Sequence, residues 1–162
     1  ERREPTGGKG VAAQLKAVIE APVSKVWPTV RDCQHFKEFM PRTGKSELLK
    51  KEGNTMLCYV EIKMPWPLDA MKLESLSTIE ELEGGGFKRS WKLSKGSFDH
   101  NNGSYQIEPF QGDESRSLVT YLVDAKPSIA VPDAILRKAQ GKTLPDMIDA
   151  IGVRAGAPAR KK

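Results

Sequence analysis

The sequence contains few cysteines and histidines, and their placement supports neither a metal site nor a catalytic centre. Cys33 and Cys58 are the only cysteines, and His35 and His100 the only histidines, among 162 residues. The two thiols could pair in an oxidising compartment, but the favoured interpretation is that Cys58 is a free, small hydrophobe in an apolar strand. Neither histidine has cysteine or carboxylate neighbours at metal-ligand spacing. Both are expected at the surface, His100 in a solvated loop over residues 98–102. We therefore expect no metal and no cofactor.

Long apolar runs and catalytic motifs are also absent. No segment approaches the roughly 18–20 apolar residues of a membrane-spanning helix. No Ser-His-Asp, glycine-elbow or phosphate-loop pattern occurs. Gly84-Gly85-Gly86 has no following helix or lysine and indicates a hairpin turn. These absences favour a protein that is not an enzyme.

The net charge of +5 is confined to the two ends of the chain. Residues 11–152 hold 19 basic and 19 acidic residues, whereas residues 153–162 hold four basic residues and no acid. A nucleic-acid-binding protein gathers its basic residues on the folded body, so we expect no nucleic-acid partner. Arg160, Lys161 and Lys162 could support transient contact with an anionic membrane surface, although a solvated terminus is the favoured interpretation.

The length of the chain fits one domain with a sizeable core. Residues 1–10 are polar and rich in glycine, which predicts a disordered lead-in, followed by one domain over residues 11–152 and a basic tail over 153–162. Because the chain begins at Glu1 and not at methionine, we expect that a signal peptide or another segment has been removed.

Most of the domain alternates between apolar and polar residues, as strands do. The alternation predicts strands over residues 11–20, 45–51, 55–64, 71–82, 87–93, 104–110 and 117–125. Turns are expected at residues 52–54, 84–86, 101–103 and 112–114, because each contains glycine with polar neighbours. Strands at such short spacing indicate one antiparallel sheet.

Two regions have helical periodicity. Val23, Val26, Trp27 and Val30 form one apolar stripe after Pro22, and residues 34–40 form a second short helix or turn. A terminal helix begins at residue 132, is interrupted by Gly141 and restarts at a capping box from residue 143. The fold class is therefore α+β. A curved sheet that wraps around one long helix leaves space for a small ligand.

Several segments resemble the helix-grip superfamily of StAR-related lipid-transfer (START) domains, polyketide cyclases and coenzyme-Q-binding proteins. Residues 19–27 (IEAPVSKVW), Arg31-Asp32 and Phe39-Met40-Pro41 resemble its opening, and residues 64–68 (MPWPL) a strand break of bacterial START-like members. Residues 103–109 and 119–121 resemble its late hairpin, and residues 129–152 its ligand-covering helix. The resemblance implies a curved antiparallel sheet around a long C-terminal helix, two short helices after the first strand, and an internal tunnel. It also favours an exported or periplasmic location.

Arg89 is the most informative candidate in the expected tunnel. It shares a strand face with Phe87 and Trp91 by period two. A guanidinium suits carboxylate and phosphate geometry, so Arg89 could hold an anionic head group while Trp91 packs against an apolar tail. The alternative is a structural arginine that pairs with an acid or reaches solvent.

The remaining candidates are apolar or aromatic side chains that face the same space. For Trp66 in particular, core packing is favoured over a place in the cavity wall or a lid loop. The residues expected to contact a ligand are Trp27, Met56, Val60, Met64, Trp66, Met71, Phe87, Arg89, Trp91, Tyr105, Tyr121, Ile135, Leu136, Ala139 and Met147.

The function predicted from the sequence is binding or transport of a lipid, sterol, quinone or polyketide-like molecule in the internal cavity. Two alternatives stay open. One is a cyclase or aromatase that shapes a reactive chain in the same cavity, and the other is a quinone chaperone that docks to a membrane complex.

Overall fold

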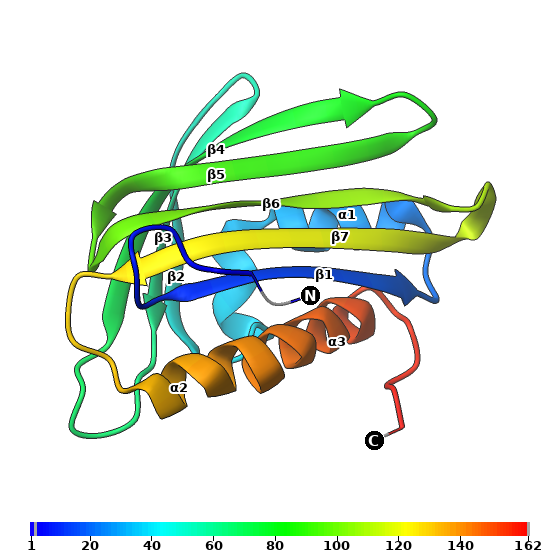
Figure 1. Ribbon diagram of the computed structural model, residues 1–162. Helices are drawn as coiled ribbons and strands as arrows, with labels where there is room; N and C mark the ends of the chain where they lie inside the picture. Colours follow the sequence, from blue (N-terminus) through cyan, green and yellow to red (C-terminus); the bar gives the residue numbers. More distant parts are fainter. Residues whose placement is uncertain (2, 162) are drawn as a thin grey trace.

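The computed structural model describes residues 1 and 3–161, which form one curved sheet with helices on its concave side (Figure 1). The strands are β1 (Val11–Ile19), β2 (Thr43–Glu52), β3 (Thr55–Ile62), β4 (Met71–Leu82), β5 (Gly86–Gly96), β6 (Phe98–Phe110) and β7 (Asp113–Pro127). The helical elements are α1 (Val23–Arg31), the 3-10 helix η1 (Cys33–Glu38), α2 (Asp133–Lys138), the π-helical turn η2 (Ala139–Thr143) and α3 (Leu144–Arg154).

All neighbouring strands are antiparallel, in the order β1-β7-β6-β5-β4-β3-β2. Strand β1 lies beside β7, so the first and last strands of the chain are adjacent. Helix α1 contacts β5, β6, β7 and α3, while the run from α2 to α3 crosses the open side of the sheet (Figure 1). The helix-grip fold expected from the sequence is confirmed.

One of the expected turns is wrong, because residues 101–103 lie inside β6 and not between strands. Gly103 pairs with Trp91 on β5 and Val123 on β7. A Cβ atom at this position would meet the backbone oxygen of Leu122 and would lie 2.6 Å from the Trp91 ring. This glycine therefore serves close packing, whereas the chain reverses at Gly96, whose φ is +141°.

The apolar stripe of α1 is confirmed, because Val23, Val26, Trp27 and Val30 are all buried. The prediction of a capping box at Thr143 is wrong, because this residue is helical and its side chain makes no capping hydrogen bond. The helical path instead continues through η2, where the Leu144 N–H bonds to the Ala139 oxygen five residues earlier. Pro145 has no N–H to complete an ordinary helical turn, and a wider turn accommodates such a residue.

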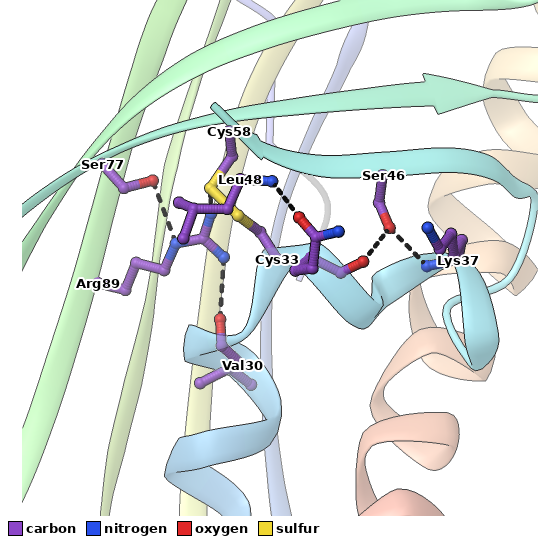
Figure 2. The surroundings of a disulfide bond; sticks show 9 residues. Val30, Cys33, Lys37, Ser46, Leu48, Cys58, Ser77 and Arg89 are labelled. Atoms are coloured by element: carbon purple, nitrogen blue, oxygen red, sulfur yellow. Dashed lines mark hydrogen bonds between the residues drawn. A yellow bond between two sulfur atoms is a disulfide. The ribbon is translucent and has the colours of Figure 1, made fainter. Parts of the chain in front are cut away.

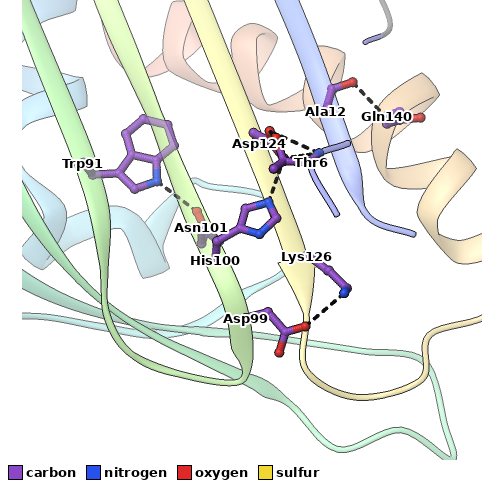
Figure 3. A network of polar contacts seen from close by, with 9 residues as sticks. All are labelled: Thr6, Ala12, Trp91, Asp99, His100, Asn101, Asp124, Lys126 and Gln140. Carbon is purple, nitrogen blue, oxygen red and sulfur yellow. Dashed lines mark hydrogen bonds and ion pairs between the residues drawn. The ribbon is translucent and has the colours of Figure 1, made fainter. Parts of the chain in front are cut away.

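The N-terminal segment makes specific contacts with the sheet. The backbone of Arg3 donates to the Ala12 oxygen, and Thr6 donates through its N–H and its hydroxyl to Asp124. The expectation that His100 lies in a solvated loop is wrong, because it sits on β6 with Nε2 2.8 Å from Asp124 Oδ1 (Figure 3).

The C-terminal segment contacts the other end of β1 and helix α3. Arg160 donates to the Val18 oxygen at 3.0 Å and lies 3.3 Å from the Asp149 carboxylate. Within residues 1 and 3–161, no helix is both long and apolar enough to cross a membrane. The domain limits at residues 11 and 152 stay a prediction.

Candidate ligand-binding cavity

A cavity of about 490 Å³ lies between the concave face of the sheet and the helical run from α2 to α3. This volume is within the range of small-molecule sites. Most of its wall is apolar and comes from β3, β4, β6, β7 and the helices. Its exposed lining residues mark the opening, which lies between the loop after β3 and helix α2; these residues are Arg42, Pro65, Ala134 and Lys138.

Ten of the fifteen residues expected at the site line this cavity. Strands carry most of them and the terminal helices carry three, so the sheet and helix enclose one space as period-two and helical spacing predicted. The ten are Val60, Met64, Met71, Arg89, Trp91, Tyr105, Tyr121, Ile135, Ala139 and Met147. Their contact with a ligand stays a prediction.

The other five expected residues do not line the cavity. Trp27 and Phe87 stack on each other with ring centroids 4.9 Å apart, because α1 covers this end of the sheet. Met56 is buried in the same core, and Leu136 is on a face of α2 that does not contact the cavity. Trp66 is 93% exposed, because the loop after β3 turns outward from the sheet. The prediction that Trp66 packs in the core is therefore also wrong.

Among the lining residues that sequence reasoning missed, two are both polar and buried, Ser75 and Asn101. Ser75 follows Met71 and Leu73 at period two, and all three line the cavity, so the alternation of β4 could have revealed it. Asn101 was hidden because the Asn-Asn-Gly sequence is typical of a hairpin turn. Both side chains are buried.

Arg89 is held at the inner end of the cavity by α1 and the sheet (Figure 2). Its Nε donates to Ser77 Oγ at 3.1 Å, and Nη1 donates to the Val30 oxygen at 2.9 Å. The guanidinium lies over the Phe36 ring, 5.3 Å from its centroid. Nη2 makes only a weak contact with Cys58 Sγ at 3.6 Å, so N–H groups remain for another acceptor.

No carboxylate pairs with Arg89 in the described part of the chain. Arg89 is only 4% exposed, and burial lowers the pKa of its guanidinium to about 10. It therefore keeps its charge at neutral pH without a counter-ion. A buried charge of this kind is costly unless a partner compensates it.

Three aromatic rings form a wall beside Arg89. The centroid distances are 5.5 Å between Trp91 and Tyr105, 5.8 Å between Trp91 and Tyr121, and 4.9 Å between the two tyrosines. Burial raises the pKa of Tyr105 to about 12 and raises the pKa of Tyr121 well above 10. Both phenols are therefore neutral at physiological pH and can donate hydrogen bonds.

Cys33 and Cys58 form a disulfide, which corrects the expectation of a free Cys58 (Figure 2). The short helix η1 packs against β2 and β3, which brings the two Cα atoms within 6.3 Å. That separation is normal for a disulfide, but the contact joins residues 25 apart and is invisible to local periodicity. The bond ties η1, and with it Phe36, to β3, where Cys58 Sγ contacts Arg89.

The charged residues around the cavity all have the same sign. Arg42, Arg89 and Lys138 line it, whereas no aspartate, glutamate or histidine does so among the described residues. The described residues also hold no cluster of three side chains that could bind a metal ion. The cavity therefore combines an apolar wall with positive charge.

The sequence matches the family described as polyketide cyclase / dehydrase and lipid transport over residues 19–151. The match spans most of the chain, and the protein belongs to this family. Comparison with curated proteins finds no significant match.

Solved structures show the same fold at low sequence identity. A STAR-related lipid transfer protein from Xanthomonas axonopodis is 19% identical with a TM-score of 0.82, covering 96% of this chain and 91% of that one. Human StAR-related lipid transfer protein 5 is 9% identical with a TM-score of 0.78, covering 96% and 80%. The Zhui aromatase/cyclase from Streptomyces is 14% identical with a TM-score of 0.70, covering 90% and 93%. This set includes lipid-transfer proteins and an aromatase/cyclase.

Proposed function

We propose that this protein binds and carries an amphiphile whose anionic group contacts Arg89 and whose apolar part fills the cavity. The observation that carries the proposal is a charged, almost fully buried arginine with no acidic partner in the described chain, at the inner end of an apolar cavity. A ligand carboxylate or phosphate would supply the missing counter-charge.

The apolar wall supports the same proposal. Each methylene group that leaves water contributes about 0.8 kcal/mol to binding, so the chain of the ligand supplies most of the affinity. Arg89 would add orientation and selectivity for an anion. Arg42 and Lys138 at the opening would also attract the anionic group of the ligand before it enters the cavity.

The carrier role is favoured over cyclase chemistry by the groups that face the cavity. General acid–base catalysis works best with a group whose pKa lies near the working pH. The cavity-lining groups whose pKa values are shifted are Arg89, Tyr105 and Tyr121, and each keeps its proton at neutral pH. A cyclase would instead have to act by shaping its substrate, and the family includes both activities by description.

Transient membrane contact is a second part of the proposal, and it rests on the opening of the cavity. Trp66 projects from the loop after β3, and Ile129 is 43% exposed in the loop after β7. In Figure 1 these two loops lie beside each other near the start of α2. Tryptophan favours the membrane interface, so this end, and not the basic tail, would meet the bilayer.

A competition assay with a fluorescent fatty acid tests the role of Arg89. We expect Arg89→Leu to weaken binding of stearate by about tenfold or more, because it removes a charge-assisted hydrogen bond. Binding of the uncharged octadecanol should change much less. Arg31→Ala is the matched control, because Arg31 is exposed at the end of α1 and should leave both affinities unchanged.

Two results would contradict the proposal. The first is failure of the delipidated protein to bind any long-chain amphiphile. The second is an equal loss of stearate and octadecanol affinity in Arg89→Leu, which would assign Arg89 a structural role.

A further inference from the structure

Asn101 offers a second polar group to the cavity, away from Arg89. It is on β6, is 6% exposed and lines the cavity. Its Oδ1 accepts a hydrogen bond from Trp91 Nε1 at 2.9 Å (Figure 3). Because an indole nitrogen can only donate, this bond fixes which end of the amide faces Trp91. The amide NH₂ group must therefore face the other way.

The NH₂ group of Asn101 has no protein acceptor in the described part of the chain. In the same part, every fully buried polar side-chain atom has a hydrogen-bond partner. Nδ2 is therefore not sealed in the protein but borders the cavity that Asn101 lines. An amide donor in such a place is costly to leave unpaired, so a ligand acceptor there gains a favourable contact.

The strand positions that carry the two polar groups are well separated along the sheet. Arg89 on β5 lies opposite Tyr105 on β6 in the strand register. Asn101 precedes Tyr105 by four residues on β6. Four residues of a strand span about 13 Å. The Trp91 ring lies between them, since it packs over Gly103 and bonds to Asn101. With bond lengths of about 1.5 Å, an extended alkyl chain covers this separation with roughly ten carbon atoms.

From this placement we propose that the ligand carries a hydrogen-bond-accepting oxygen about ten carbon atoms from its anionic group, and that Asn101 Nδ2 binds it. The ligand class is then an oxygenated long-chain acid, with a hydroxyl or keto group near the middle of the chain. The inference rests on the proposed function, because Arg89 fixes the orientation of the ligand. Asn101 selects among amphiphiles that Arg89 alone would accept equally.

The test compares 12-hydroxystearate with stearate on the delipidated full chain. For the wild-type protein we expect about tenfold tighter binding of the hydroxy acid, the effect of one buried hydrogen bond. Asn101→Asp keeps an oxygen for Trp91 and removes the NH₂ donor. It is tested with 12-oxostearate, because a ketone only accepts hydrogen bonds whereas a 12-hydroxyl could donate to the new carboxylate, and the preference over stearate should disappear. The preference is the ratio of two affinities measured on the same variant. The new carboxyl acts equally on the anionic group of both acids, so its effect cancels in this ratio. Asn101→Leu, which also removes the donor, provides a second measurement.

The position of the oxygen is tested with 2-hydroxystearate. Its hydroxyl adjoins the carboxylate, so it should gain nothing from Asn101. The inference is overturned if wild-type protein binds stearate and 12-hydroxystearate equally, or if both Asn101 variants keep the full preference. Failure of the proposed function would give a different result. In that case neither acid would bind, or Arg89→Leu would weaken the binding of stearate and octadecanol equally.

Discussion

The two ends of the concave sheet face are built from the same strands but are packed in opposite ways. At the α1 end, Val26, Val30, Ile107, Val119 and Ile151 have almost no exposed surface. At the α2 end, residues of the same strands that lie closer to α2 surround a cavity of about 490 Å³. Arg89 lies at the boundary, bonded to the last turn of α1 and facing the cavity.

This difference indicates a division of roles. Close packing at the α1 end provides stability, since dispersion and apolar burial are lost wherever atoms lack neighbours. The open end gives up those contacts, and the NH₂ group of Asn101 there has no protein acceptor in the described part of the chain. Substitutions at the α1 end should therefore change the free energy of unfolding, whereas substitutions at the α2 end should change ligand affinity.

The largest effect is expected for Trp27→Ala. Loss of its stacking on Phe87 and of its buried area should lower the free energy of unfolding by about 3–5 kcal/mol, measured by urea denaturation. Trp66→Ala is the matched control, because the same substitution at an exposed side chain should change stability by less than about 0.5 kcal/mol. Similar losses in the two variants would contradict the assignment of Trp27 to the packed end.

Removal of the disulfide should have the next largest effect. Cys33→Ala combined with Cys58→Ala releases a link between residues 25 apart, which should cost about 3 kcal/mol of unfolding free energy. Wild-type protein in reductant should unfold at the same urea concentration as the double variant. If reductant leaves the wild-type midpoint unchanged, the bond does not contribute as expected.

The same substitution at two positions of β7 compares the two ends directly. Val119 and Val123 point to the same side of the strand, but Val119 is in the packed core and Val123 lines the cavity. Val119→Trp should lower stability by about 1–3 kcal/mol or prevent folding, because a full core has no room. Val123→Trp should cost less stability but weaken stearate binding strongly.

Calorimetric titration and urea denaturation of both variants measure these effects. The contrast fails if Val123→Trp destabilises the fold as much as Val119→Trp does. It also fails if Val123→Trp leaves stearate affinity intact, since the ligand would then bind elsewhere.

The smallest expected effect concerns pH. Burial lowers the pKa of Arg89 to about 10, so its charge is complete at neutral pH and is lost as the pH rises through that value. Binding of an alkyl sulfate, whose own charge is constant over this range, should be flat between about pH 7 and 9 and weaken several-fold near pH 10. Arg89→Leu should bind weakly and without this step. A step of the same size in Arg89→Leu would assign it to other groups.

The fold was largely predictable because its signals are local. The alternation of β3, β4 and β5 and the stripe of α1 gave the elements, and the resemblance gave their arrangement. Asn-Asn-Gly is typical of a turn, but here the glycine is required by the Trp91 ring on a neighbouring strand, and no local pattern carries that information.

The cavity was predictable only in part, for the same reason. Period two identified Arg89 and Trp91 on one face, but it could not show that Phe87 on that face would be covered by Trp27 from α1. Nor could it show that Cys33 and Cys58 meet, or that the loop carrying Trp66 turns outward. Each of these depends on contacts between elements that are distant in sequence.

The most direct test of the central claim is native mass spectrometry of the purified protein, followed by solvent extraction and identification of bound molecules. A carrier with this cavity should retain a single amphiphile of anionic character, lost from Arg89→Leu but kept by Arg31→Ala. A protein that is empty, and that also fails to take up long-chain acids when they are added, would contradict the claim that the cavity is a binding site.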